Sequence, residues 1–224
     1  MKYIFSIILF LFLFSCSDQK NENIQSLFGV NLFDNVSNYL DDNDISDQIS
    51  DWDEYEGKVF GILPLPLIQQ LPLIEGKEYV RMYDVFLDQD LTIQGIFSFR
   101  DPITLNKSDF NLTNNCSLQQ RALINRVSNY HDIDKSSFNQ QTWKHVDGFF
   151  DASTKDVIIN DESVKLVIGC VYTPNISSYE SDTEDAFNAF LWYSLSSEIN
   201  FKYALSLMSA AEIVDFNKEM LGSF

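Results

Sequence analysis

The two histidines are the side chains of this chain best suited to general acid–base chemistry. His145 follows Trp143 by two residues and precedes Asp147 by two, so all three would share one face of a strand. A carboxylate can orient an imidazole as a general base, which makes His145 the candidate centre of a hydrolase. Because the sequence contains no nucleophile motif such as G-x-S-x-G, packing or surface exposure is the favoured interpretation of His145.

His131 lies close to two acidic residues, Asp132 and Asp134. A metal ion is one interpretation of this group. The favoured one places His131 at the C-terminal end of a helix, where a histidine interacts well with the helix dipole.

An acidic stretch raises the question of calcium, which needs several oxygen ligands from closely spaced side chains. Asp42, Asp44, Ser46 and Asp53 have the spacing of positions 1, 3, 5 and 12 of an EF-hand loop. Asp47, however, stands where that loop needs glycine for its turn. A solvated acidic loop is therefore favoured, and a calcium-dependent binding module is kept as an alternative.

The start of the chain has the layout of a secretory signal. Lys2 supplies a positive charge, and residues 3–14 are apolar except for Ser6. This run is too short for a permanent membrane span, which needs about 20 residues. A basic start with a short apolar run is typical of a signal peptide, which we assign to residues 1–15. The segment Leu13-Phe14-Ser15-Cys16 resembles the lipobox of bacterial lipoproteins.

This resemblance implies that Cys16 becomes the mature N-terminus and carries acyl chains such as palmitate. Each buried CH₂ contributes about 0.8 kcal/mol, so a multiply acylated cysteine holds a domain firmly on a bilayer. Ser17 follows the cysteine where Asp would imply inner-membrane retention, so the resemblance favours a periplasm-facing place at the outer membrane. The segment 27–35, LFGVNLFDN, also resembles the start of small uncharacterised lipoproteins. The alternative is an ordinary signal peptide cut near Cys16.

Two cysteines remain once Cys16 is assigned to lipidation, namely Cys116 and Cys170. Because export implies an oxidising compartment, an even remainder predicts a disulfide between them. The alternative is a pair of buried free thiols. No CxxC or Cys/His spacing indicates redox or zinc chemistry.

The net charge of −18 excludes a nucleic-acid-binding surface, which needs a basic face. The chain also contains no P-loop or G-x-G-x-x-G motif, and no cofactor is expected. Together these observations favour a non-enzymatic binding or structural role in the cell envelope. The expected partners are the membrane, through the lipid anchor, and an envelope protein. A lipid-anchored hydrolase is the alternative.

The hydrophobic pattern predicts where the elements lie. Residues 16–26 would form the lipidated start and a polar tether, and residues 27–224 one globular domain. The proline-rich residues 64–72 would form an irregular loop or an edge segment. Helices are expected near residues 32–40, from Asn114 or Asn115, and from Ser209 to about Leu221. Strands are expected near residues 78–87, 91–99, 141–150, 156–159, 163–172 and 198–207, with a loop at 100–113. Residues 186–195 fit a helix by their apolar spacing and a strand by their aromatic content, and a strand is favoured.

This order predicts an α+β fold with antiparallel sheet in two helix-plus-meander halves and a C-terminal helix. Val164, Leu166, Ile168 and Cys170 alternate along one strand, so Cys170 would face the core. The disulfide would then join the second helix to this strand.

Overall fold

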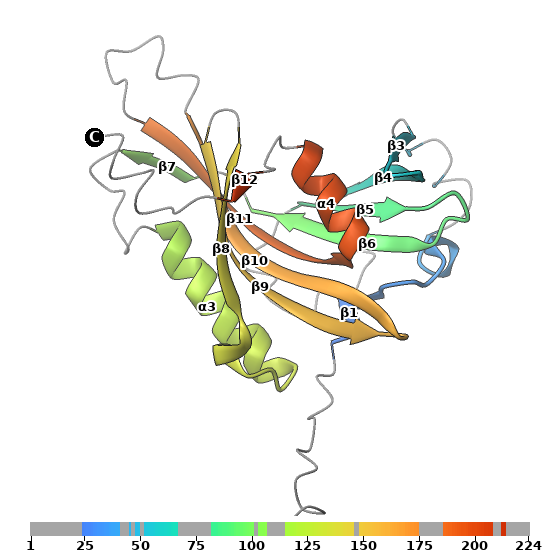
Figure 1. The fold of residues 1–224 in the computed structure, drawn as a ribbon, viewed down its shortest axis with the longest axis horizontal. Coiled ribbons are helices and arrows are strands. Elements are labelled where there is room, and N and C mark those ends of the chain that lie inside the picture. The colour runs from blue at the N-terminus through green and yellow to red at the C-terminus, as the bar shows by residue number, and fades with distance from the viewer. Residues whose placement is uncertain are drawn as a thin grey trace, which may run out of the picture.

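A computed structural model describes residues 24–40, 45, 48–49, 52–66, 82–100, 103–106, 115–145, 148–174, 186–207 and 212–213. These residues form a 10-stranded antiparallel sheet with two α-helices and a separate two-stranded sheet (Figure 1), which confirms the α+β class. The strands of the large sheet are β3 (Asp53–Tyr55), β4 (Lys58–Pro66), β5 (Met82–Leu87), β6 (Ile93–Phe99), β7 (Ile103–Asn106), β8 (Asn139–His145), β9 (Gly148–Ile159), β10 (Glu162–Pro174), β11 (Ala186–Ser197) and β12 (Glu212–Ile213). The other elements are β1 (Ser26–Leu27), β2 (Val30–Asn31), the helices α3 (Asn115–Tyr130) and α4 (Glu198–Leu207), and the 3-10 turns η1 (Val36–Asn38) and η4 (Lys135–Ser137).

The large sheet consists of two runs of sequential antiparallel strands. Its order is β12-β8-β9-β10-β11-β6-β5-β4-β3, with β7 paired to the start of β11. The first run, β3 to β6, therefore meets the second, β8 to β11, where β6 pairs with β11. This arrangement places three long strands, β9 to β11, at the centre of the molecule (Figure 1).

The helices cover opposite faces of the sheet. Val164, Leu166, Ile168 and Cys170 of β10 are buried together with α3 and the N-terminal segment, as the alternation predicted. Val167 and Val171, which point the other way, belong to a second cluster with α4. Burial on both faces explains why residues 166–172 in the middle of β10 are apolar without a break.

Three hairpins turn on two residues that both have positive φ, as a type I′ turn requires. The turn residues are Phe28-Gly29, Glu56-Gly57 and Asn160-Asp161. In the first turn, the ring of Phe28 is buried and lies edge-on to Tyr193 with centroids 5.8 Å apart. Packing thus holds a bulky residue in a backbone conformation that glycine prefers.

The predicted helix over residues 32–40 was wrong, because the structure has only the 3-10 turn η1 there. The backbone of this segment pairs instead with the β5–β6 turn. The N–H groups of Phe33 and Val36 donate to the carbonyls of Ile93 and Leu91 at 2.8 and 2.9 Å. Ile24 belongs to the expected polar tether, yet it is only 1% exposed. The packed core therefore begins before residue 27.

The second half of the chain shows further differences. Residues 198–207 form α4 and not a strand, because Ser197 caps a helix through a 3.4 Å bond from the N–H of Asn200. The expected strand 141–150 is split between β8 and β9, and the loop 100–113 contains β7. Of the expected helix 209–221, only Glu212–Ile213 are described, and they form β12.

Other predictions were confirmed. The structure has the hairpin between β5 and β6, α3 from Asn115, and a strand over residues 186–195. Pro64 and Pro66 lie in β4 beyond its pairing with β3, which covers only residues 58–60. This part of β4 therefore has described strands on one side only, where a residue without an N–H is tolerated.

Candidate functional site

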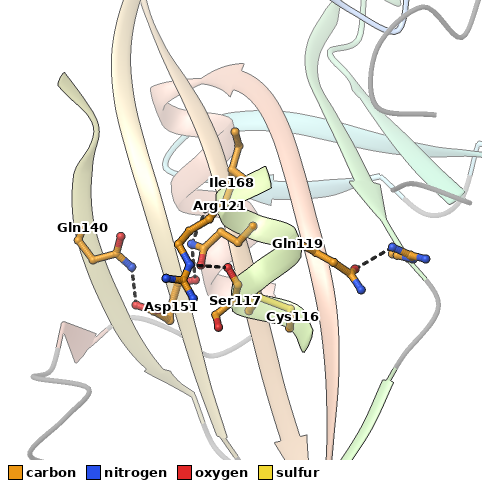
Figure 2. Close-up of a disulfide and its surroundings, with 10 residues drawn as sticks. Cys116, Ser117, Gln119, Arg121, Gln140, Asp151 and Ile168 are labelled. Atoms are coloured by element: carbon orange, nitrogen blue, oxygen red, sulfur yellow. Dashed lines mark hydrogen bonds between the residues drawn. A yellow bond between two sulfur atoms is a disulfide. The ribbon is translucent and has the colours of Figure 1, made fainter. Parts of the chain in front are cut away.

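The predicted disulfide between Cys116 and Cys170 is present, and both residues are 0% exposed. It joins the first turn of α3 to β10 with Cα atoms 6.1 Å apart (Figure 2). Beside it, the buried Gln120 amide donates to the Ile168 carbonyl at 3.0 Å and to the Asp151 carbonyl at 3.4 Å. One covalent bond and two hydrogen bonds thus hold this end of α3 on the sheet.

A polar cluster on the same face of the sheet is the best candidate for a recognition site. It consists of Gln140 and Thr142 of β8 and Asp151 and Ser153 of β9. The carboxylate Oδ1 of Asp151 accepts hydrogen bonds from Gln140 Nε2 at 2.7 Å and from Thr142 Oγ1 at 2.9 Å. Ser153 Oγ donates to Gln140 Oε1 at 2.8 Å. Figure 2 shows Gln140 and Asp151 on neighbouring strands next to α3.

The environment of this carboxyl group is mostly desolvating. Burial raises the pKa of Asp151, and the hydrogen bonds from Gln140 and Thr142 partly oppose that rise by stabilising the anion. The hydrogen-bond donors to the carboxylate are a neutral amide and a hydroxyl. The cluster therefore has the chemistry of hydrogen-bond recognition, with Gln140 exposed at its rim.

The opposite face of the sheet is aromatic. Trp143, Phe150 and Trp192 form a continuous series, with ring centroids 5.3 and 4.8 Å apart. Trp143 and Trp192 are buried, so they pack the core and do not line an open groove. Phe201 of α4 meets Trp143 edge-on at 5.8 Å, which helps α4 to cover this face.

Of the four residues of the calcium candidate, the structure describes only Asp53. Asp42, Asp44 and Ser46 lie outside the described residues. Asp53 belongs to β3, and its carboxylate accepts a 2.7 Å hydrogen bond from the hydroxyl of Tyr203 on α4. Within the described residues, no group of three or more His, Cys, Asp or Glu is arranged to hold a metal ion.

The histidines take different positions. His145 ends β8, while Asp147 lies outside the described residues. His131 directly follows α3 and is buried, and its N–H donates to the Val127 carbonyl at 2.9 Å. Asp134 caps η4 through a 2.9 Å bond from the Ser136 N–H. The Asp134 carboxylate near His131 thus stabilises the turn η4.

Two partly buried carboxyl groups, Asp84 and Asp151, were missed by the sequence analysis. Asp151 lies in a run of alternating polar residues, which was the available signal. Asp84 interrupts the apolar strand β5, and burial raises its pKa. The sequence analysis placed neither residue, and the structure shows that both are partly covered.

No family model, curated protein or solved structure matches this chain. Neither helix in the described ranges has both the length and the apolar content that crossing a membrane requires. Cys16 and the apolar run before it lie outside those ranges.

Proposed function

We propose that this protein is a lipoprotein of the bacterial cell envelope, anchored through acyl chains on Cys16 and facing the periplasm. The outer membrane is favoured over the inner membrane as the site of the anchor. The buried disulfide is the observation that carries the proposal. It uses the two cysteines that remain once Cys16 is assigned to the lipid, and disulfides persist mainly in oxidising compartments. The lipobox-like residues 13–16 supply the anchor.

We further propose that the domain binds an envelope partner and catalyses no reaction. The cluster around Asp151 supports recognition, because its exposed Gln140 is linked to the carboxylate by a 2.7 Å hydrogen bond. An acidic domain of this charge stays soluble beside the membrane and resists non-specific association. Turnover of any hydrolase substrate by the purified protein would contradict this part of the proposal.

The anchor is tested by metabolic labelling with an alkyne-bearing fatty acid, followed by membrane fractionation. We expect the full-length chain to be labelled and membrane-bound, and Cys16→Ser to lose the label. The matched control is Ser17→Ala, which changes the neighbouring residue, leaves all three cysteines in place and keeps the label. A labelled, membrane-bound Cys16→Ser variant would refute the assignment.

The partner is tested by placing a photo-crosslinking residue at Gln140 in cells. A discrete crosslinked envelope protein is expected there, and the same residue at exposed Gln89, on the distant β5–β6 turn, serves as the control. Equal products from both positions would argue against a specific surface.

The division into two helix-plus-meander halves belongs to this proposal as well. The strand order supports this division, because β6, the last strand of the first run, pairs with β11, the last strand of the second run. In this division the opening helix of the first half is reduced to the turn η1.

A further inference from the structure

The carboxylate of Asp84 is a half-buried charge for which the fold supplies no partner. It lies on β5, where the next two residues, Val85 and Phe86, are buried. Within the described ranges, no group donates a hydrogen bond to this carboxylate or forms an ion pair with it. Burial raises its pKa, as expected for a desolvated carboxylate that no donor compensates. A polar group that breaks the packing rules in this way is a candidate for a functional contact.

Aromatic residues lie beside Asp84 on the neighbouring strand. Phe97 of β6 is directly opposite Asp84 and therefore lies on the same face of the sheet. Phe99, two residues further along β6, shares this face and is only half-buried. Both rings meet the Trp192 ring edge-on, with centroids 5.5 and 5.2 Å away. The carboxylate thus adjoins a set of rings that hold one another in place.

The helix α4 leaves this margin of the aromatic face partly open. Its Tyr203 ring meets Phe86 edge-on at 5.9 Å, and Phe86 is buried. Asp84 precedes Phe86 by two residues on the same face of β5, and both Asp84 and Phe99 keep part of their surface exposed. A ligand arriving from solvent can therefore reach the carboxylate and the Phe99 ring together.

We propose that Asp84 and Phe99 form a binding site for a guanidinium group, the arginine side chain of a protein partner. A guanidinium is planar, donates two hydrogen bonds to a carboxylate and stacks on aromatic rings. The net charge of −18 favours this ligand, because it attracts cations to the surface. The site is separate from the cluster around Asp151, which lies on the opposite face of the sheet.

The test uses N-acetyl-arginine amide as the probe, titrated into the isotope-labelled full-length protein and followed by NMR. We expect saturable shifts of the backbone amide signals of Asp84, Phe97 and Phe99. Asp84→Asn keeps the size and shape of the side chain but removes its charge, and should weaken binding of the probe by about tenfold or more. The matched control is Asp151→Asn, which removes a half-buried carboxylate from the other face and should leave the affinity unchanged.

A second probe separates charge from shape. N-acetyl-citrulline amide carries a neutral urea group in place of the guanidinium and should bind about tenfold more weakly or not at all. Equal binding of the arginine probe by Asp84→Asn and the wild type overturns the proposal. So does an equal loss of affinity in Asp151→Asn, or equal binding of the two probes. None of these outcomes bears on the lipid anchor or on the surface at Gln140, since neither includes Asp84.

Discussion

The disulfide between Cys116 and Cys170 makes a quantitative prediction for stability. The bond crosslinks residues separated by 54 positions. In the chain-entropy model, the loss of freedom in the unfolded chain for a loop of this length is worth about 4 kcal/mol at 25 °C. A domain of ordinary stability has only about 5–15 kcal/mol in total, so removal of the bond should leave the protein marginal.

Two perturbations separate the crosslink from the packing of the sulfur atoms. Reduction of the wild-type protein keeps both sulfur atoms in the buried site, whereas Cys116→Ala with Cys170→Ala removes them. We expect reduction to lower the free energy of unfolding by about 4 kcal/mol. The double variant should lose more, because truncation in a closely packed core leaves a cavity.

The assay is urea unfolding at equilibrium, with and without reductant, on the full-length protein. Both perturbations remove the covalent link between α3 and β10. The 3.0 Å hydrogen bond from Gln120 to the Ile168 carbonyl still connects the two elements in each case. A loss below about 1 kcal/mol on reduction would refute the reasoning, because it would mean that the unfolded chain is not appreciably constrained by the bond.

Four other substitutions test the packing and electrostatics. Gly169→Ala should lower the free energy of unfolding by about 1–3 kcal/mol in urea, because its Cβ would lie 2.6 Å from Ala152 Cβ. Gly57→Ala should lower the free energy of unfolding by only about 1 kcal/mol, because its Cβ would meet nothing within 4 Å and only the φ of +76° is unfavourable. An equal loss of stability at both glycines would contradict the steric argument. Tyr203→Phe should cost about 1 kcal/mol, since it removes the hydrogen bond to Asp53; calorimetric melting that matches the wild type would show that this bond contributes nothing. Asp84→Asn should be more stable than the wild type near pH 7, because burial raises the pKa of Asp84 and the charged carboxylate is unfavourable there. The wild type becomes more stable as the pH is lowered toward about 4 and Asp84 is protonated in the folded state. The stability difference between variant and wild type should therefore shrink over that range. A difference that does not change with pH would contradict the assigned cause.

The amphipathic patterns explain which elements could be predicted. The alternation Val164, Leu166, Ile168, Cys170 placed Cys170 on the buried face, and the structure confirms both the strand and the bond. The helix α3 was predicted because its apolar residues recur at helical spacing behind a capping asparagine. In these segments, local preference and long-range packing favour the same structure.

The predictions for residues 198–207 and 32–40 were wrong because long-range packing there overrides the local pattern. Residues 198–207 alternate like a strand, yet the Ser197 cap and the burial of Phe201 and Tyr203 against the aromatic face make them helical. The segment around η1 has helical spacing, but its backbone hydrogen bonds go to the β5–β6 turn. Each outcome depends on a neighbour that is distant in the sequence.

Four features could be derived from the amino-acid sequence alone: the acidic charge, the lipobox-like start, the strand that contains Cys170, and the pair of cysteines available for a bond. These features follow from residue type and short-range period. The pairing of β6 with β11, the half-buried position of Asp151 beside Gln140 and Thr142, and the contact of Asn200 with Gly95 became visible only in the folded chain. The reason is that pairing and burial depend on which surfaces meet, and that choice is made by the whole chain when it closes its core.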